Sequence, residues 1–291
     1  MSGNVLFVFG LGFSARALAA QLTYEGWEVR GTTRGAESAL ALTDVGHTTY
    51  AFDGVTPLAN FSEALEGVTH LLVSVPPGAD GDPVLRHHST EIAACAEKIK
   101  WVGYLSTTGV YGDRAGDWVD EKSPLDPATE RGARRVAAEA GWCDLWRDHE
   151  LPVHLFRLAG IYGPGRNVLD TVRQGKARRI VKPDQVFSRI HVDDIAAVLT
   201  ASIARPNPGA AYNVCDDDPT PPQDVVVHAC ELLGVAPPPE IAFEDAELSE
   251  MARSFYAESK RVSNTRIKEE LGVELIYPDY RVGLAALLAA S

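Results

Sequence analysis

The sequence is poor in cysteine, and none of its cysteines stands in a Cys-x-x-Cys pair. The four thiols are scattered along the chain as Cys95, Cys143, Cys215 and Cys230. Metal sites and disulfide frameworks need clustered or regularly spaced cysteines, so neither is expected and no metal is predicted. Each cysteine is expected to pack as a small apolar residue, and isolated reduced thiols fit a protein of the cytoplasm.

Basic charge and long apolar runs are also scarce. The 291 residues include 27 Lys and Arg against 40 Asp and Glu, a formal net charge of -13. Nonspecific nucleic-acid binding relies on basic surface, so no nucleic-acid partner is expected. No apolar run approaches the length of a membrane span, and Gly10 and Gly12 break the apolar start of the chain too early for a signal peptide. The expected partner is therefore a small molecule, and a phosphate-rich one needs a local basic site.

The strongest pattern lies at the start of the chain. Residues 4–9 form a short apolar run typical of a buried strand, and Gly10-Leu-Gly12-Phe-Ser-Ala15 leads from it into a helix. Glycine permits a tight turn, and a helix N-terminus offers N–H donors and partial positive charge to a pyrophosphate. In this context Gly-x-Gly-x-x-Ala predicts a dinucleotide site, whereas a plain turn is the alternative. The residues expected to contact the cofactor here are Gly10, Gly12, Phe13, Ser14 and Ala15.

The end of the second predicted strand bears on which dinucleotide binds. An acidic residue near this place holds the adenosine ribose hydroxyls in such folds, whereas an arginine accommodates a 2′-phosphate. Here the strand ends with Thr32, Thr33 and Arg34, without an Asp or Glu, and threonine hydroxyls can add donors for a phosphate. A guanidinium fork matches a phosphate, so NADP is favoured over NAD. The alternative is that Arg34 is an ordinary solvated loop residue.

Strands and helices then alternate with short connections. The predicted strands lie at 48–52, 68–75 and, together with its loop, 101–112, and the predicted helices at 36–45 and 83–98. This alternation indicates an α/β fold with a doubly wound parallel sheet of the Rossmann-like kind. Because the carboxyl ends of parallel strands line the ligand crevice, Ser74, Val75 and Pro76 are expected to border the cofactor.

Four later segments form a recognisable series. They are Leu105-Ser-Thr-Thr-Gly-Val-Tyr-Gly112, Phe156-Arg-Leu-Ala-Gly-Ile-Tyr-Gly-Pro-Gly165, Arg189-Ile-His-Val-Asp-Asp-Ile-Ala196 and Ala211-Tyr-Asn-Val214. With the glycine loop, they resemble the extended short-chain dehydrogenase/reductase family, the group of sugar-nucleotide epimerases and dehydratases. The resemblance implies an NAD(P)-dependent oxidoreductase, epimerase or dehydratase, and a homodimer through the long helices after strands four and five. It also implies a dinucleotide-binding domain over 1–161 and 186–214, and a smaller, discontinuous substrate lobe over 162–185 and 215–291.

The family's acid/base pair is missing from its expected place. In the family, a Tyr-x-x-x-Lys pair follows strand five: the Tyr hydroxyl moves the proton, and the Lys lowers its pKa and holds the nicotinamide ribose. Matching the trailing Ala-Ala-Glu139 puts Arg131 in the Tyr position and Arg135 in the Lys position. Arg135 is still expected to bond ribose hydroxyls, whereas Arg131 stays protonated and accepts no proton. A literal Tyr-x-x-x-Lys occurs at Tyr256–Lys260, but in the C-terminal region, where the family has no such element.

Hydroxyls at the end of strand five are the next candidates. The resemblance makes Thr107 the substrate-binding hydroxyl, and Ser106 beside it is expected at the nicotinamide; the alternative is a pair of turn hydroxyls. Further candidate proton donors and bases are Tyr111, Tyr162, Glu130 and Asp113. Nothing in the sequence singles one out, and the catalytic positions are assigned to Thr107 and Tyr111.

One basic concentration stands out in the acidic chain. Its members are Arg166, Lys176, Arg178, Arg179 and Lys182. In the family this region binds the nucleotide end of the substrate. The resemblance therefore implies an anionic substrate, for example a nucleotide sugar. The residues expected to hold it are Arg166, Arg178 and Arg189. The alternative is a solvated helix face.

Two local expectations concern the second half of the chain. Asp193 and Asp194 are expected to cap a helix over 195–204. Residues 260–272 are expected to form a helix that Gly272 ends.

Two functions remain open at this stage. The first is an NADP-binding oxidoreductase or epimerase-like enzyme with an unusual acid/base. The second is a dinucleotide-binding sensor or regulatory protein that kept the crevice and lost turnover, because fold alone does not fix function. The arginine replacements favour the sensor, and the Thr107 loop with the basic lobe favours the enzyme.

Overall fold

The computed structural model describes residues 3–35 and 47–291, apart from the side chain of Met251. The helix expected over 36–45 lies outside the described residues. The chain folds into two compact units, which are described separately. The first unit comprises Met1–Thr107, Ala133–Arg157 and Ile195–Tyr212, and the second comprises Thr108–Gly132, Leu158–Asp194 and Asn213–Ser291.

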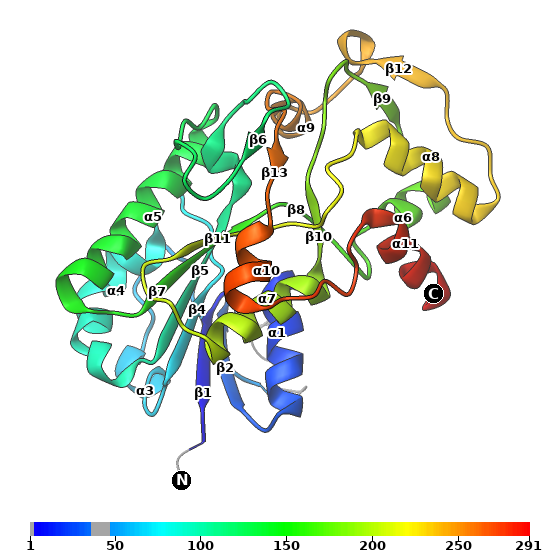
Figure 1. Ribbon diagram of the computed structural model, residues 1–291. Coiled ribbons are helices and arrows are strands. Elements are labelled where there is room, and N and C mark those ends of the chain that lie inside the picture. Colours follow the sequence, from blue (N-terminus) through cyan, green and yellow to red (C-terminus); the bar gives the residue numbers. More distant parts are fainter. Residues whose placement is uncertain (1–2, 36–46) are drawn as a thin grey trace. The chain divides into compact units, whose positions relative to one another are not determined.

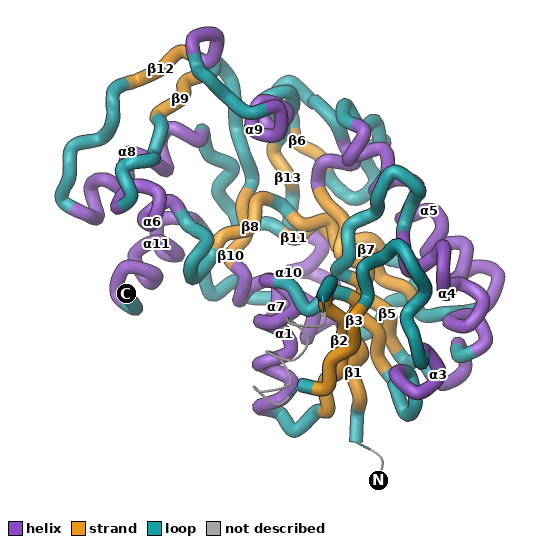
Figure 2. Tube along the Cα trace, turned by 180° about the vertical axis from the view of Figure 1, so that it is seen from behind, coloured by secondary structure: helices purple, strands orange, loops and turns teal. Residues whose placement is uncertain are grey.

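A seven-stranded sheet organises the described part of the chain. The strands are β1 (Val5–Phe9), β2 (Glu28–Thr33), β3 (Thr48–Ala51), β4 (His70–Val73), β5 (Trp101–Thr107), β7 (Val153–Leu158) and β11 (Ala211–Val214). Their order is β11-β7-β5-β4-β1-β2-β3 (Figures 1 and 2), and the pairs β1–β2, β1–β4, β2–β3 and β4–β5 are parallel. The predicted α/β fold with a doubly wound, Rossmann-like sheet is confirmed. The strand order reverses between β1 and β4, which is where such sheets bind ligands.

Helices cover both faces of this sheet (Figures 1 and 2). The helical elements joined to it are α1 (Phe13–Tyr24), α3 (Phe61–Ala64), α4 (Pro83–Ala94), η1 (Ala96–Lys98), α5 (Glu130–His149) and α7 (Val192–Ala204). On one face, Val84 and Ile92 of α4 and Trp142 of α5 are buried in the same core as Phe7 and Phe9 of β1. The central strand β1 is buried along its whole length, as expected of a strand covered on both faces.

The second unit holds short strands and helices. They are η2 (Thr108–Tyr111), β6 (Trp118–Val119), β8 (Gly160–Tyr162), α6 (Val168–Arg173), β9 (Arg179–Val181), β10 (Arg189–His191), α8 (Pro222–Leu233), β12 (Glu240–Ala242), η3 (Phe243–Asp245), α9 (Glu250–Phe255), β13 (Arg261–Val262), α10 (Thr265–Leu271) and α11 (Tyr280–Ala289). The pairs β8–β10, β9–β12 and β6–β13 are parallel. A separate small core forms where α6, α8 and α11 pack, around Leu169, Ala229 and Leu284.

Two local expectations for the second unit need correction. The helix expected over 260–272 ends at Gly272 as predicted but begins only at Thr265, as α10, because residues before it pair with β6: Arg261 N donates to Asp117 O and Ser263 N to Val119 O. Asp193 and Asp194 do not cap α7, which already begins at Val192. Instead, the Asp194 carboxylate accepts bonds from the amides of Ile276 and Tyr277, at 2.7 and 3.1 Å.

Among the described residues, no helix combines the length and apolar character needed to cross a membrane. No three His, Cys, Asp or Glu side chains in 3–35 and 47–291 gather closely enough to hold a metal ion. All four cysteines are free thiols, and Cys215 and Cys230 are buried.

A buried ion pair joins α5 to the sheet in the first unit. Arg157 of β7 donates through Nη2 to Glu139 Oε2 at 2.8 Å, and Ser106 of β5 donates to Glu139 Oε1 at 2.5 Å. The three residues are only 3–5% exposed. Removing one partner of such a pair strands the other charge without water, which destabilises far more than losing a surface pair.

We expect Glu139→Gln to lower the free energy of unfolding by about 3–5 kcal/mol, because Arg157 then lacks its buried counter-ion. The matched control is Asp144→Asn on the same helix, which breaks the exposed pair with Arg147 and should cost less than about 0.5 kcal/mol. Urea unfolding followed by tryptophan fluorescence measures both. Equal effects for the two variants would refute the role given to Glu139.

The buried side chain of His154 is expected to make the free energy of unfolding depend on pH. It is fully buried, its Nδ1 contacts Val102 O at 3.2 Å, and its Nε2 accepts a bond from Asn207 N at 2.9 Å. Burial lowers the pKa of His154 to about 4 from an ordinary 6.5. Since the folded pKa is depressed, the stabilisation is complete above pH 6.5 and is lost as the pH falls towards 4.

Between pH 7 and pH 5, we expect the wild-type protein to lose about 2 kcal/mol more unfolding free energy than His154→Gln. A glutamine does not titrate, so other groups cancel in the comparison. Urea titrations at both pH values provide the measurement, with the exposed His149→Gln as the control. A parallel decline in all three proteins would show that His154 does not titrate in this window.

Candidate cofactor and catalytic site

A cleft of about 620 Å³ opens in the first unit. It is lined by the loops that follow β1, β2, β3 and β4, and by the first turns of α1 and α4. These loops lie at the carboxyl ends of parallel strands, on both sides of the point where the strand order reverses. In doubly wound sheets this is the position of a dinucleotide.

The turn after β1 is held so tightly that only glycine fits at its first position. Gly10 has φ of +90°, and a Cβ there would lie 2.9 Å from Val75 Cγ2. Its amide donates to Thr32 Oγ1 at 2.9 Å, and the amide of Leu11 donates to Thr32 O at 2.8 Å. Thr32, at the polar end of β2, thus fixes this turn with its buried hydroxyl.

At Gly12, glycine is not required by packing within the protein. A Cβ there would meet no protein atom closer than Gly10 O, at 3.9 Å, so packing within the protein does not require glycine. Gly12 is the N-cap of α1, lines the cleft and offers no side-chain acceptor to the helix amides. Bare amides at a helix start suit a pyrophosphate, and a missing side chain lets it approach closely.

The other glycine-loop residues serve the helix. Phe13 is the first residue of α1, and Ser14 and Ala15 are buried, at 6% and 0% exposure. Ala15 therefore packs inside the unit, as its small size predicts. The predicted contact of Ser14 and Ala15 with the cofactor is limited to their backbone, because neither side chain borders the cleft. These contacts remain predictions.

The remaining predicted cofactor residues of the first unit surround the same cleft. Thr33 and Arg34 line it after β2, and Ser74, Val75 and Pro76 line it after β4. The Thr33 hydroxyl donates to Gly35 O at 3.1 Å, which shapes the strand exit.

Two further arginines of the cleft escaped the sequence analysis. Arg16 follows the glycine motif directly, and its Nε donates to Leu11 O at 3.0 Å, while Arg86 lies on α4. Arg16 could have been found from its place beside the motif. Arg86 had no sequence signal, because only the fold brings α4 to this cleft.

The end of β5 carries the predicted hydroxyl pair. Ser106 is buried and donates to Glu139, as described above, so its hydroxyl belongs to the ion-pair network. Thr107 is half-buried and is the last residue of β5. Arg135 of α5 donates through Nη1 to Leu105 O and stands 5.7 Å from the centre of the Tyr104 ring. The guanidinium predicted to stand in the family's lysine position is thus bonded to the strand that bears Thr107.

Tyr111 lies in the second unit and is fully buried. Its hydroxyl donates to Asn213 Oδ1 at 2.7 Å, and the Asn213 amide donates to Glu121 Oε1 at 2.7 Å. In this arrangement the phenol ties the 108–111 turn to β11. Asp113, another candidate base, accepts bonds from the amides of Ser259 and Ala115 and also serves a loop.

The arginine predicted to stand in the family's tyrosine position faces an aromatic ring. Arg131 is exposed, and its guanidinium carbon lies 4.7 Å from the centre of the Phe255 ring in the second unit. No carboxylate of the described chain pairs with it. The literal motif at Tyr256–Lys260 follows the end of α9 rather than lying on a helix, and Lys260 is buried with its Nζ donating to Gly112 O at 2.7 Å. That lysine therefore holds a loop.

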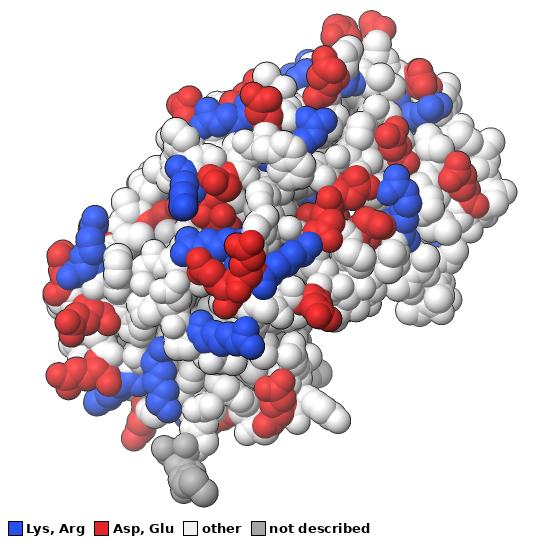
Figure 3. Space-filling view, viewed as in Figure 1, with Lys and Arg blue, Asp and Glu red and all other residues white. Residues whose placement is uncertain are grey.

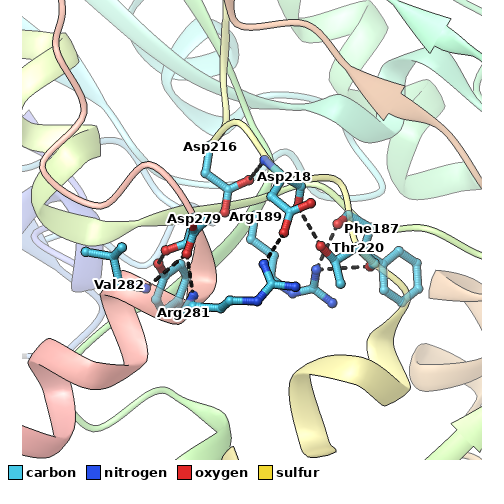
Figure 4. Close-up of polar contacts among 9 residues, drawn as sticks. Phe187, Arg189, Asp216, Asp218, Thr220, Asp279, Arg281 and Val282 are labelled. Carbon is cyan, nitrogen blue, oxygen red and sulfur yellow. Dashed lines mark hydrogen bonds and ion pairs between the residues drawn. The ribbon is translucent and has the colours of Figure 1, made fainter. Parts of the chain in front are cut away.

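The three predicted substrate arginines have different partners. Arg166 is exposed, and Arg178 donates to Glu247 O. Arg189 sits in a polar cluster of the second unit, shown in Figure 4, where its Nη1 donates to Phe187 O at 2.9 Å and Thr220 O at 3.1 Å. Their role towards a substrate remains a prediction.

Charges in the Arg189 cluster are partly neutralised. Burial raises the pKa of Asp216 to about 8, although nearby Arg189 opposes that rise. Asp218 pairs with Arg281 at 2.7 Å, also drawn in Figure 4. On the molecular face in Figure 3, acidic and basic side chains are interspersed rather than separated by sign. Any attraction for an anion at these places is therefore local.

Comparison with known proteins places this geometry in context. A protein of unknown function from Silicibacter pomeroyi DSS is 54% identical, with a TM-score of 0.90 over 99% of both chains. Protein YeeZ of Escherichia coli K12 is 29% identical over 284 residues, covering 94% of this chain and 96% of YeeZ. The dTDP-glucose 4,6-dehydratase of Bacillus anthracis, solved with NAD, shares the fold: its TM-score is 0.77 at 16% identity, over 99% of this chain and 96% of that one.

One protein-family model matches most of the chain. Residues 6–215 match the model of the NAD dependent epimerase/dehydratase family. The match includes the glycine turn, the end of β5 and the whole of α5, so the resemblance drawn from the sequence motifs is confirmed. The chain belongs to the NAD dependent epimerase/dehydratase family.

Proposed function

We propose that the protein binds NADP(H) in the cleft of its first unit and uses it to oxidise or reduce a small anionic substrate. The observation that carries the proposal is the cleft itself, which combines bare amides at the start of α1 with an arginine at the end of β2. The first suits a diphosphate and the second a further phosphate. The reaction would take place in the cytoplasm, where the coenzyme is available.

The glycine turn fits the dinucleotide by shape. A Cβ at Gly10 would displace Val75, and a side chain at Gly12 would enter space that the protein leaves open beside the α1 amides. Gly12 and the first turn of α1 would hold the pyrophosphate, with Arg16 near its charge. Ser74, Val75 and Pro76 would border the coenzyme on the β4 side.

The charge at the end of β2 supports NADP over NAD. NAD-specific sites use a carboxylate there to bind two ribose hydroxyls, and this strand ends with Thr33 and Arg34 instead. Asp53 also lines the cleft, but its Oδ1 accepts bonds from the amides of Val55 and Thr56 and so caps its own turn. The bound NAD of the Bacillus anthracis dehydratase belongs to a fold relative and leaves this choice open.

Replacing Arg34 with glutamate tests the cofactor preference. We expect the affinity for NADPH to fall at least about 30-fold, because the variant opposes a 2′-phosphate with a like charge, while the affinity for NADH changes less than about three-fold. Fluorescence titration with each reduced coenzyme measures both constants. The control is Arg30→Glu, at an arginine of β2 outside the cleft. Equal losses for NADPH and NADH would show that Arg34 does not read the phosphate.

The chain's own residues limit the chemistry. A bound nicotinamide supplies hydride transfer at its C4 atom. Thr107 would bond the reacting oxygen of the substrate, and Arg135, held by Leu105 O, would turn its remaining N–H groups to the nicotinamide ribose. Arg131 keeps its proton and accepts none, so its guanidinium suits a carboxylate or phosphate of the substrate rather than proton transfer. Anion binding by Arg166, Arg178 and Arg189 would add to this preference, and a nucleotide sugar is one such substrate.

A second candidate function is a dinucleotide-binding sensor. The observation that favours it is the engagement of both replacement arginines, Arg135 with Leu105 O and Arg131 with the Phe255 ring. Neither arrangement provides a group that gives and takes a proton near neutral pH. A sensor would need only the cleft and the change that coenzyme binding produces around it.

Turnover separates the two functions. We expect the enzyme to oxidise NADPH with at least one anionic carbonyl compound from a panel of 2-oxo acids and nucleotide sugars, followed at 340 nm. Thr107→Val should lower kcat at least about ten-fold and leave the Kd for NADPH unchanged, since it removes a bond to the reacting oxygen alone. Because an epimerase regenerates its coenzyme, products are also identified by mass spectrometry and NMR. NADPH binding without any product would establish the sensor instead.

A further inference from the structure

Arg131, in the first turn of α5, is an exposed arginine without a protein acceptor. Its guanidinium carbon lies 4.7 Å from the centre of the Phe255 ring. In the part of the chain that the structure describes, no carboxylate or carbonyl oxygen accepts a bond from this side chain. Arg173 of the same unit, by contrast, is also exposed and pairs with Asp170 at 3.4 Å. The N–H groups of Arg131 are therefore available to a ligand, in a chain that has an excess of acidic side chains.

The helix start that carries Arg131 is fixed by the residue that follows it. Gly132 is buried, and a Cβ there would lie 2.8 Å from both Gly109 O and Pro127 Cβ. The amide of Gly132 donates to Thr129 Oγ1 at 3.1 Å, which holds the first turn of the helix. A larger residue would push this turn away from η2. The glycine thus keeps the backbone of Arg131 close to η2, the turn that directly follows β5 in the chain.

The Phe255 ring is exposed although the backbone beside it is anchored. Phe255 is the last residue of α9 and is 49% exposed. The next residue, Tyr256, packs its ring 5.2 Å from that of Phe243 and 5.5 Å from that of Phe187, centre to centre. The carbonyl of Tyr256 also accepts a bond from Lys182 Nζ. The segment is therefore held by Tyr256, and it presents the Phe255 ring to solvent from a fixed position.

Arg131 and Phe255 together offer two kinds of binding surface. A guanidinium fork matches a carboxylate with two parallel bonds, and stacking on an aromatic face leaves its N–H edges free to form them. The ring adds apolar surface that an alkyl or aryl group of the same ligand can cover. A phosphate or a sugar would use the arginine and leave the ring bare. A carboxylate that stands next to an apolar group uses both.

We propose that Arg131 and Phe255 form a specificity site for the substrate, in which Arg131 binds a carboxylate and Phe255 packs against the adjoining apolar group. The substrate is then an alkyl- or aryl-substituted carboxylic acid rather than a nucleotide sugar. This inference rests on the proposed function for the reaction itself, and it narrows the anionic substrates considered there. It also gives a role to the arginine that the sequence match places at the family's tyrosine position: Arg131 positions the substrate and transfers no proton.

Ligand-observed NMR titration with four probes tests the site, with and without saturating NADPH. The probes are 3-phenylpropanoate, its neutral amide, propanoate and UDP-glucose. We expect the wild type to bind 3-phenylpropanoate at least about ten-fold more tightly than each of the others, because only this probe carries both a carboxylate and an aryl group.

Two substitutions separate the two halves of the site. Arg131→Gln should weaken 3-phenylpropanoate about ten-fold and abolish the difference between the acid and its amide. Phe255→Ser should weaken 3-phenylpropanoate about five-fold and leave propanoate unchanged, because only the aryl group loses its contact. Arg131→Lys keeps the charge without the fork, so its affinity should lie between those of the wild type and Arg131→Gln. The matched control is Arg173→Gln, at an exposed arginine that already has an acidic partner.

The possible results discriminate sharply. Equal affinity of the wild type for the acid and its amide overturns the proposal, and so does a loss in Arg131→Gln no larger than in the control. Tighter binding of UDP-glucose than of 3-phenylpropanoate refutes the substrate class. A loss of propanoate in Phe255→Ser as large as that of 3-phenylpropanoate shows that the ring only supports Arg131, which also overturns the proposal. A separate assay follows NADPH with phenylpyruvate at 340 nm. Binding that depends on Arg131 without any oxidation of NADPH would support the site and count against the proposed function alone.

Discussion

The close approach of β1 and β4 at Gly10 is the constraint on which the cofactor cleft depends. There the missing Cβ lets the Val75 side chain and amide pack within about 3.3 Å of where it would stand. Thr32 binds the turn from the opposite side, through its hydroxyl and its carbonyl. With both neighbours fixed, the start of α1 is placed at the reversal point of the sheet with its amides towards the cleft. A bulkier residue would move the loops of three strands together, because each is packed against this one turn.

Helix α5 carries both the residues that hold it to the sheet and the residues that are predicted to act in the reaction. One face keeps Glu139 in a buried pair with Arg157, which fastens the helix to β7 and, through Ser106, to β5. One turn earlier, Arg135, which the sequence match predicts to stand at the family's lysine position, carries a guanidinium that reaches the carbonyl of Leu105. The helix can therefore keep its place while its first two turns acquire different functional groups. The residues that fasten the helix differ from those predicted to face the reaction, so the family match shows the fold and leaves the reaction type to experiment.

Sequence alone predicted the parts of the structure that depend on local chemistry. The strands from β1 to β5 and the glycine turn follow from runs of apolar residues and from what a turn demands at Gly10, and each stands where it was expected. Asp194 was misread because its amide partners, at Ile276 and Tyr277, lie some eighty residues away in the sequence. The helix α10 is shorter than predicted for the same reason. The residues before it pair with β6, and no local sequence pattern predicts that pairing. Tyr111 looked like a proton donor from its motif, and only the fold shows its hydroxyl bonded to Asn213.

Arg86 illustrates the same limit for the site and suggests why an acidic protein can hold an anionic coenzyme. With a net charge of -13, the protein's overall field disfavours a phosphate-rich ligand. At 0.15 M ionic strength, however, charges are screened beyond about 8 Å, so a bound phosphate responds chiefly to its immediate neighbours. Arg16, Arg34 and Arg86 come from α1, the end of β2 and α4, and all three line one cleft. They are dispersed in the sequence and brought together only by the fold, which provides the local basic site that a phosphate-rich ligand needs in an acidic protein.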